Sequence, residues 1–195
     1  MTKVTASLGK GLLHLPKGRR RGRIPRTAME IKNLSREEFK KLREELVRIY
    51  LEGYKGLEQY SYRAPWMVKR YLNWLYKGDP AGFFVVEEEG KIAGFVSAHS
   101  RWFWGMELVG EIHELVIAPA YRRRGFGTAL LRHTIEFLRS KGRKRIGLWV
   151  GKENEQAKKL YRKFGFRPTD VFDVWERWVL DEADYHGLKI NRKEI

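Results

Sequence analysis

The segment at residues 115–138 constrains the fold more than any other part of the chain. It opens with an apolar run, breaks at Pro119, and reads Arg-Arg-Arg-Gly-Phe-Gly over residues 122–127. Apolar residues then return at helical spacing, at positions 130, 131, 135 and 138. The pattern predicts a strand that runs through a glycine turn into a helix. Free backbone N–H groups at the start of such a helix form an anion site, which indicates a phosphate-bearing cofactor.

Composition narrows the classes of protein that fit this segment. The chain has 195 residues, of which 43% are hydrophobic, so it can build one full core. Cysteine is absent, which excludes disulfides, zinc–thiolate sites and cysteine nucleophiles. No apolar run approaches the roughly 20 residues of a membrane helix, and the first residues lack the apolar segment of a secretory signal. We therefore expect a cytoplasmic protein that does not associate with membranes.

Positive charge is concentrated at the N-terminus. The formal net charge is +16, and residues 1–28 contain no acidic residue and many Lys and Arg. We expect residues 1–28 to be a basic, flexible extension, residues 29–180 to be the folded domain, and residues 181–195 to be a tail. Such a charge favours anionic partners in general, including nucleic acid and phosphorylated cofactors.

Hydrophobic periodicity predicts an α/β protein. Ser35 and Glu38 form a capping-box pattern at the start of the first helix. The elements follow the order β-α-α-β-β-β-α-β-α-β-β, with a mostly antiparallel first half and one βαβ crossover. The predicted bounds are strand 28–34, helix 35–49, helix 65–76, strands 83–86, 92–98 and 111–117, helix 126–141, strand 146–150, helix 153–164, and one or two strands within 166–180.

The glycine turn carries the first chemical signal. Gly125 and Gly127 lack a Cβ, so the backbone can bend sharply and a ligand can approach closely. The amides of residues 123–128 then point at a diphosphate, with the Thr128 hydroxyl and the charges of residues 122–124 beside it. A glycine turn that serves packing alone gives the same pattern, so this motif by itself leaves both interpretations open.

A second motif lies on the helix at residues 153–164. Asn154, Ala157 and Tyr161 are spaced so that they share one helical face, and Phe164-Gly165-Phe166 follows. The small Ala157 leaves room for a ligand chain along the helix, and the phenol of Tyr161 can donate a proton to a leaving group. The alternative interpretation of Tyr161 is a half-buried core aromatic.

Together the two motifs resemble those of the GNAT superfamily of acetyl-CoA-dependent N-acetyltransferases. That family has Arg/Gln-x-x-Gly-x-Gly/Ala after a strand with a Leu-x-Val-x-Pro core, and here residues 115–119 and 122–127 match it. Its later motif, Asn-x-x-Ala-x-x-Leu-Tyr-x-x-x-Gly-Phe, is present at residues 154–166. The resemblance covers about residues 29–180. It implies a mixed, mostly antiparallel central sheet flanked by helices, with a V-shaped opening between the strands at 111–117 and 146–150.

The resemblance also implies where acetyl-CoA binds. Backbone groups of Leu115 and Ile117 would hold the acetyl carbonyl and the pantetheine arm, residues 122–128 the pyrophosphate, and Asn154 the pantetheine. Tyr161 would protonate the departing thiolate after direct attack of a neutral amine on the acetyl carbon. No metal is implied. The implied cofactor-binding residues are Leu115, Val116, Ile117, Arg122, Arg123, Arg124, Gly125, Phe126, Gly127, Thr128, Asn154, Ala157 and Tyr161.

The general base is left open among three residues of the strand at 111–117. Glu111 and His113 share a face with Leu115 in a regular strand, whereas Glu114 lies on the other face unless a bulge breaks the phase. Glu111 and Glu114 are favoured over His113, and no base is needed if the amine arrives neutral.

The acceptor is also left open. A protein or peptide amine and a small-molecule amine fit equally well, the net charge favours an acidic partner, and the chain is a monomer or a homodimer. The alternative class is a nucleic-acid-associated protein that uses the basic arm at residues 17–26, either non-catalytic or acetylating RNA. Six aromatic residues fall in segments that wall the acceptor pocket in the family, and we expect most of them to be core: Tyr60, Tyr62, Trp66, Trp74, Trp102 and Trp104.

Overall fold

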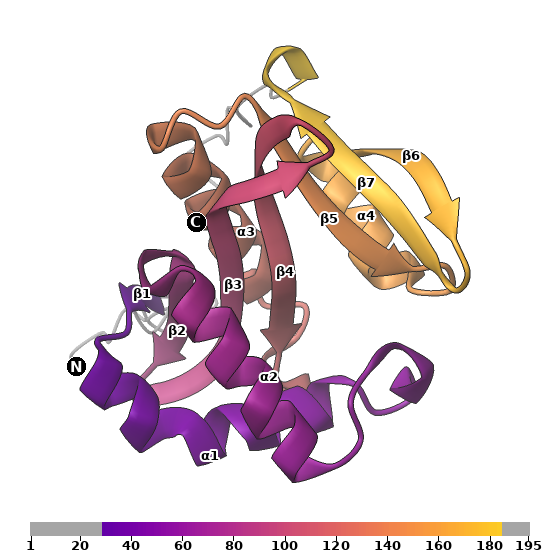
Figure 1. Cartoon of the computed structure of the whole chain (residues 1–195). Helices are drawn as coiled ribbons and strands as arrows, with labels where there is room; N and C mark the ends of the chain where they lie inside the picture. The colour runs from indigo at the N-terminus through magenta and orange to yellow at the C-terminus, as the bar shows by residue number, and fades with distance from the viewer. Residues whose placement is uncertain (1–28, 185–195) are drawn as a thin grey trace, which may run out of the picture.

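The computed structural model describes residues 29–184, and its elements follow the predicted order (Figure 1). The predicted extension at residues 1–28 and most of the predicted tail at 181–195 lie outside the described residues. The strands are β1 (Met29–Asn33), β2 (Phe83–Glu88), β3 (Lys91–Trp104), β4 (Glu107–Ile117), β5 (Arg145–Gly151), β6 (Arg167–Phe172) and β7 (Trp175–Asp181). The α-helices are α1 (Arg36–Gly53), α2 (Pro65–Gly78), α3 (Phe126–Ser140) and α4 (Glu155–Lys163).

One seven-stranded sheet, in the order β1-β2-β3-β4-β5-β7-β6, organises the chain. Every neighbouring pair is antiparallel except β4 and β5, which are parallel. The β4–β5 ladder joins residues 110–112 to residues 146–148 and then stops. Residues 113–117 and 149–151 therefore continue without pairing to each other, and the ends of the two strands point apart in Figure 1. The predicted V-shaped opening is confirmed.

The helices cover the sheet from both sides. Figure 1 shows α1 and α2 on the near side and α3 and α4 behind the sheet. Apolar residues of α1, α2 and strands β2–β4 form one core, and those of α3, α4 and the strands behind them form the other. The predicted apolar stripe of α3 is buried in this second core, at Leu130, Leu131, Ile135 and Leu138. No helix of the described residues is long and apolar enough to cross a membrane.

The first helix begins where the capping box predicts. The Ser35 amide donates to Glu38 Oε2 at 2.8 Å, and the Glu38 amide donates to Ser35 Oγ at 3.3 Å. These bonds satisfy backbone donors that have no acceptor within the helix, which is worth about 0.5–2 kcal/mol at such a cap.

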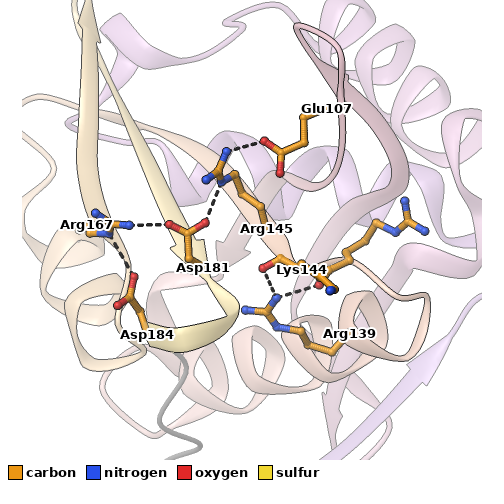
Figure 2. Close-up of polar contacts among 8 residues, drawn as sticks. Glu107, Arg139, Lys144, Arg145, Arg167, Asp181 and Asp184 are labelled. Atoms are coloured by element: carbon orange, nitrogen blue, oxygen red, sulfur yellow. Dashed lines mark hydrogen bonds and ion pairs between the residues drawn. The ribbon is translucent and has the colours of Figure 1, made fainter.

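Ion pairs join four strands at the end of the sheet opposite the opening (Figure 2). Arg145, at the start of β5, pairs with Glu107 at the start of β4 and with Asp181 at the end of β7. Arg167 of β6 pairs with Asp181 at 2.5 Å and with Asp184 at 3.1 Å. Exposed pairs of this kind contribute little singly, but this network holds the strands together at the end where they are paired.

A β-bulge interrupts the pairing of β3 with β4. Ser97 pairs with Glu114 and Ala98 pairs with Ile112, so His113 has no partner across the ladder. The extra residue reverses the alternation of side chains, as bulges do. Glu111, His113 and Glu114 consequently all face the α1–α2 side, while Leu115 packs with the α3–α4 core. The sequence left open whether a bulge breaks the alternation of this strand, and the structure contains that bulge.

Candidate active site

Two adjoining cavities open where β4 and β5 separate. The first, which we call the basic cavity, has a volume of about 650 Å³ and lies between the end of α1, the turn before α3, and α4. The second, the aromatic cavity, has a volume of about 560 Å³ and lies between the α1–α2 segment, β4 and the ends of β5 and β7. Both cavities are lined by the same five residues where they meet: Tyr54, Leu115, Asn154, Ala157 and Tyr161.

The glycine turn forms one end of the basic cavity. Gly125 is the N-terminal cap of α3 and has a φ of 93°, in the left-handed region that only glycine adopts at low cost. Gly125, Gly127 and Thr128 line the cavity, and the first amides of α3 have no acceptor within the helix. Backbone donors and the positive end of the helix dipole therefore face this space.

The three arginines of the turn have different roles. Arg123 lines the basic cavity. Arg122 also lines it, but its guanidinium donates to the carbonyls of Ile117 and Gly53 and so ties the turn to β4 and α1. Arg124 does not line the cavity, because its side chain pairs with Glu88 of β2.

The other predicted cofactor-binding residues of this region also divide into those that line the basic cavity and those that do not. Phe126 is buried in the α3–α4 core and does not line the basic cavity. Val116 does line it, although its side chain packs beneath Gly53, where a Cβ would lie 2.4 Å from Val116 Cγ1. Leu115 and Ile117 line the cavity beside it.

The row on α4 lies at the junction of the two cavities. Asn154 caps the helix, and its Oδ1 accepts a hydrogen bond from the Ala157 amide at 3.1 Å. Tyr161 is 7% exposed, and burial raises the pKa of its phenol well above the usual value, with the Glu114 charge adding to the shift. Among the described residues its hydroxyl has no hydrogen-bond partner. This phenol stays protonated at neutral pH and has a proton to give.

Glu114 is one of two buried carboxylates that line the aromatic cavity. Tyr54, which follows α1, donates its hydroxyl to Glu114 Oε1 at 2.7 Å. Burial raises the pKa of Glu114 to about 7, and the hydroxyls of Tyr54 and Tyr71 oppose the rise by favouring the ionised form. A carboxyl with such a pKa can accept a proton near neutral pH.

Glu111, unlike Glu114, is held in a buried ion pair. Arg177 of β7 donates to both of its oxygens, with Nη2 at 2.7 Å from Oε2, and both residues are buried. Burial raises the pKa of Glu111, and the hydrogen bonds and charge of Arg177 oppose this. Gly147 of β5 makes room for the pair, since a Cβ there would lie 1.9 Å from Arg177 Nη2. With both oxygens bound, Glu111 is poorly placed to accept a proton from a substrate.

His113 lines the aromatic cavity and is neutral. Burial lowers its pKa to about 3, with His99 and Arg177 adding to the shift. Its ring packs against Trp74 and Trp102, with centroids 5.0 and 4.7 Å away. Protonation at neutral pH is therefore excluded in this environment.

The aromatic residues that wall the second cavity are mostly not the predicted ones. Tyr60 and Tyr62 line it, whereas the four predicted tryptophans do not. The expectation that most of these six residues are core is also wrong, because Trp66, Trp74, Trp104 and Tyr62 are exposed. The other aromatic residues that line the cavity are Tyr50, Tyr54, Tyr71, Trp149, Tyr161, Phe172 and Trp175.

Sequence reasoning missed Tyr54, Tyr71 and Arg177. Tyr54 and Arg177 reach their carboxylates across more than 50 residues of chain, and no local pattern marks such contacts. Gly147 did carry a signal, because a glycine within a strand often marks a close approach of other atoms.

Charge divides the two cavities. Among residues 29–184, the basic cavity is lined by Arg122, Arg123, Lys159 and Lys163, with Glu155 as its one acidic residue. Within the same range, the aromatic cavity is lined by Glu111 and Glu114 and by neither Lys nor Arg. The basic arm at residues 17–26, on which the nucleic-acid alternative depends, lies outside the described residues.

Comparison with known sequences identifies a family for this chain. Residues 39–166 match the model of the acetyltransferase (GNAT) family. An uncharacterized N-acetyltransferase of Methanocaldococcus jannaschii is 37% identical over 76% of this chain, and the match spans 65% of that protein's length. An uncharacterized N-acetyltransferase of Archaeoglobus fulgidus is 37% identical over 68% of this chain and 89% of its own.

Solved structures agree as well. A protein of Pyrococcus horikoshii OT3 has a TM-score of 0.72 and 34% identity, covering 79% of this chain and 98% of its own. A putative acetyltransferase of Salmonella typhimurium, solved with acetyl-CoA, has a TM-score of 0.64 and 20% identity, covering 84% and 99%, and supports the fold alone. The chain therefore belongs to the acetyltransferase (GNAT) family of acyltransferases.

Proposed function

We propose that this chain transfers the acetyl group of acetyl-CoA to a primary amine by direct attack within a ternary complex. The observation that carries the proposal is the junction of the two cavities. A donor in the basic cavity and an acceptor in the aromatic cavity meet at Tyr54, Leu115 and Tyr161, among other shared residues. Holding the two reactants together in this way supplies much of the acceleration of a bimolecular reaction.

The basic cavity suits the donor. Its helix N-terminus, Arg123, Lys159 and Lys163 match the phosphates of a CoA thioester. The N-acetyltransferase of Thermoplasma acidophilum that shares this fold was solved in complex with coenzyme A. In the described part of the chain, residues 113–117 of β4 have no partner on the side of β5, so backbone groups on that edge are available to the pantetheine and to the acetyl carbonyl. A backbone N–H on this edge would stabilise the oxyanion of the tetrahedral intermediate.

Glu114 and Tyr161 are the groups we propose for proton transfer. Glu114 would accept one proton from the bound ammonium, directly or through water, and so free the neutral amine that attacks the acetyl carbon, because its pKa of about 7 suits exchange near neutral pH. When the tetrahedral intermediate collapses, Tyr161 would donate its phenolic proton to the departing thiolate at the junction of the cavities, and the phenolate would regain a proton from the nitrogen as the amide forms. Glu111 would have no proton-transfer role because Arg177 binds both of its oxygens. His113 would have none because its pKa of about 3 makes it a poor proton acceptor at neutral pH.

The aromatic cavity favours an amine on an apolar body with no anion close to the nitrogen. An ammonium ion is attracted by Glu114 and by aromatic faces, whereas a neighbouring carboxylate would find neither Lys nor Arg among the described residues of the lining. The local lining thus opposes the acidic acceptor that the net charge favours. A peptide or protein amine and a small-molecule amine both satisfy this chemistry.

The activities named for relatives do not narrow the class of acceptor. One is a putative ribosomal protein bS18-alanine N-acetyltransferase of Bacillus subtilis, 30% identical over 59% of this chain and 73% of its own length. Another is a mycothiol acetyltransferase of Thermobispora bispora, 32% identical over 53% of this chain and 32% of its own length.

A thiol-release assay tests the proposal. Purified protein with acetyl-CoA is challenged with phenethylamine, a peptide with a free apolar N-terminal residue, phenylalanine and RNA. We expect release of CoA with the first two and little with phenylalanine, whose carboxylate lies next to the amine. Calorimetry measures acetyl-CoA binding in parallel. Binding without release for every amine would contradict the acceptor assignment, and absence of binding would contradict the donor site.

A further inference from the structure

One segment crosses the opening and forms a wall of the aromatic cavity. This segment, residues 55–63 between α1 and α2, is called the strap here. In Figure 1 it curls below the ends of β5 and β7. Residues 59–62 of the strap line the cavity. Only Tyr60 is buried within the strap, at 7% exposure, and the other strap residues are exposed or half-buried.

The Tyr60 side chain packs on the other side of the opening, against Gly151 at the end of β5. This contact is called the seat of Tyr60 here. Its ring lies over Gly151, the last residue of β5, where a Cβ would fall 2.5 Å from the ring. Its hydroxyl accepts a hydrogen bond from the Glu153 amide at 3.1 Å. The Trp175 ring lies 5.2 Å away between centroids. The Tyr60 ring therefore occupies the space that a side chain at residue 151 would fill, and glycine at residue 151 leaves that space open.

The remaining attachments of the strap to other elements are weaker. Gln59 Nε2 donates to Glu153 Oε2 at 3.3 Å in an exposed position, and the Tyr62 amide donates to the Tyr50 hydroxyl at 3.3 Å. The first bond is exposed and both bonds are long, so each contributes little. The Tyr62 ring also lies 5.2 Å from the Tyr71 ring, a contact that holds this end of the strap to α2. Among the described residues, the position of the strap over β5 therefore depends mainly on the packing of Tyr60 on Gly151.

We propose that Tyr60, held on Gly151, is a specificity-determining residue that fixes the outer wall of the acceptor cavity and limits the bulk of the amine that enters. The inference rests on the proposed function, in which the aromatic cavity takes the amine. Gly151 is required because any Cβ would occupy the space of the Tyr60 ring. Moving the ring off its seat moves residues 59–62 with it and widens the cavity between the strap and Trp175.

The first test measures selectivity. Gly151→Ala and Tyr60→Ala are compared with wild type for kcat/KM toward primary amines of rising bulk, from ethylamine through phenethylamine to a naphthyl-substituted ethylamine. Both variants should raise the ratio for the naphthyl amine over ethylamine by about tenfold, the scale on which a pocket discriminates small differences in size. The Kd of acetyl-CoA should stay within about twofold, because neither residue lines the basic cavity.

Two further variants serve as controls. Tyr60→Phe keeps the ring on Gly151 and loses only the bond from Glu153, so its ratio should lie closer to wild type than that of Tyr60→Ala. Gly90→Ala, in the β2–β3 hairpin, has open space around it but a φ of 73°, so it reports the effect of a destabilising glycine substitution far from the strap. An unchanged ratio in both Gly151→Ala and Tyr60→Ala would overturn the inference.

A second readout does not require turnover. Lys55 and Arg63 are exposed trypsin sites at the two ends of the strap. Limited proteolysis followed by mass spectrometry should show faster cleavage at both sites in Gly151→Ala than in wild type or Gly90→Ala. Unchanged cleavage in folded Gly151→Ala would overturn the seat of Tyr60. If no protein acetylates any amine while cleavage accelerates as expected, the proposed function fails and the seat of Tyr60 stands.

Discussion

The hydroxyl of Tyr54 donates a hydrogen bond to Glu114 Oε1 across 2.7 Å. Tyr54 directly follows α1, and Glu114 comes directly after the bulge of β4. The contact therefore joins the end of the first helix to the strand that borders both cavities. It also favours the ionised form of a carboxyl whose pKa burial raises to about 7.

The pH dependence of the reaction should follow Glu114. A base must be unprotonated to accept the ammonium proton, so kcat/KM should rise with pH and level off above about pH 7, where Glu114 has lost its proton. A pH profile with an acceptor of much higher pKa separates this limb from titration of the amine itself. A flat profile between pH 5.5 and 8.5, over which a group of pKa about 7 titrates, contradicts the assignment.

Tyr54→Phe should move the rise of kcat/KM with pH to higher pH. The substitution removes a donor to the carboxylate, so the ionised form of Glu114 loses stabilisation and the midpoint should rise by about one pH unit. Tyr62→Phe is the matched control, because Tyr62 lines the same cavity and makes no hydrogen bond to Glu114. A wild-type midpoint in both variants would show that the Tyr54 hydroxyl does not stabilise the ionised form of Glu114.

Tyr161→Phe should lower turnover far more than donor affinity. The ring that packs in the α3–α4 core is kept, and only the proton for the thiolate is lost. We expect kcat to fall by about 10²-fold or more while the Kd of acetyl-CoA, measured by calorimetry, stays near wild type. Equal turnover in the two proteins removes Tyr161 as the acid.

Gly125→Ala should weaken acetyl-CoA binding beyond its effect on folding. The φ of 93° costs a residue with a Cβ about 1–2 kcal/mol, which strains the turn that lines the basic cavity. Gly142→Ala is the matched control, since Gly142 has a φ of 75°, has open space around it and lies beyond the other end of α3. Urea unfolding and calorimetry on both variants separate the two effects. Equal losses of affinity would refute a special role for the turn.

Arg177 should matter for stability rather than for proton transfer. Arg177→Met leaves Glu111 as a buried carboxylate without a partner, which costs about 3–5 kcal/mol in the free energy of unfolding. The double variant Arg177→Met with Glu111→Gln removes both charges and should recover part of that loss in urea denaturation. A single variant as stable as wild type contradicts the role of the pair.

The sequence predicted those parts of the site that depend on local pattern. The turn at Gly125 and the row of Asn154 and Tyr161 are set by glycine, capping and helical spacing, so each could be placed without the fold. The order of elements followed from periodicity for the same reason. The V-shaped opening came from family resemblance and is confirmed by the short β4–β5 ladder.

The rest of the site depends on contacts between distant segments. Nothing near residue 113 marks a bulge, so a regular alternation separated Glu114 from Glu111, whereas the structure places them on one side. The partners that distinguish the two carboxylates, Tyr54 and Arg177, come from a helix end and a late strand. Their effect on chemistry appears only once the sheet is assembled.

The most direct test of the account is the single-turnover rate of acetyl transfer to phenethylamine by enzyme saturated with acetyl-CoA. The rate is measured for wild type and for Glu114→Gln by mass spectrometry of the amide product at about pH 8. If Glu114 is the base, the rate in the variant should be lower by about 10²-fold or more, with the Kd of acetyl-CoA unchanged. Equal single-turnover rates in the two proteins would contradict this role of Glu114.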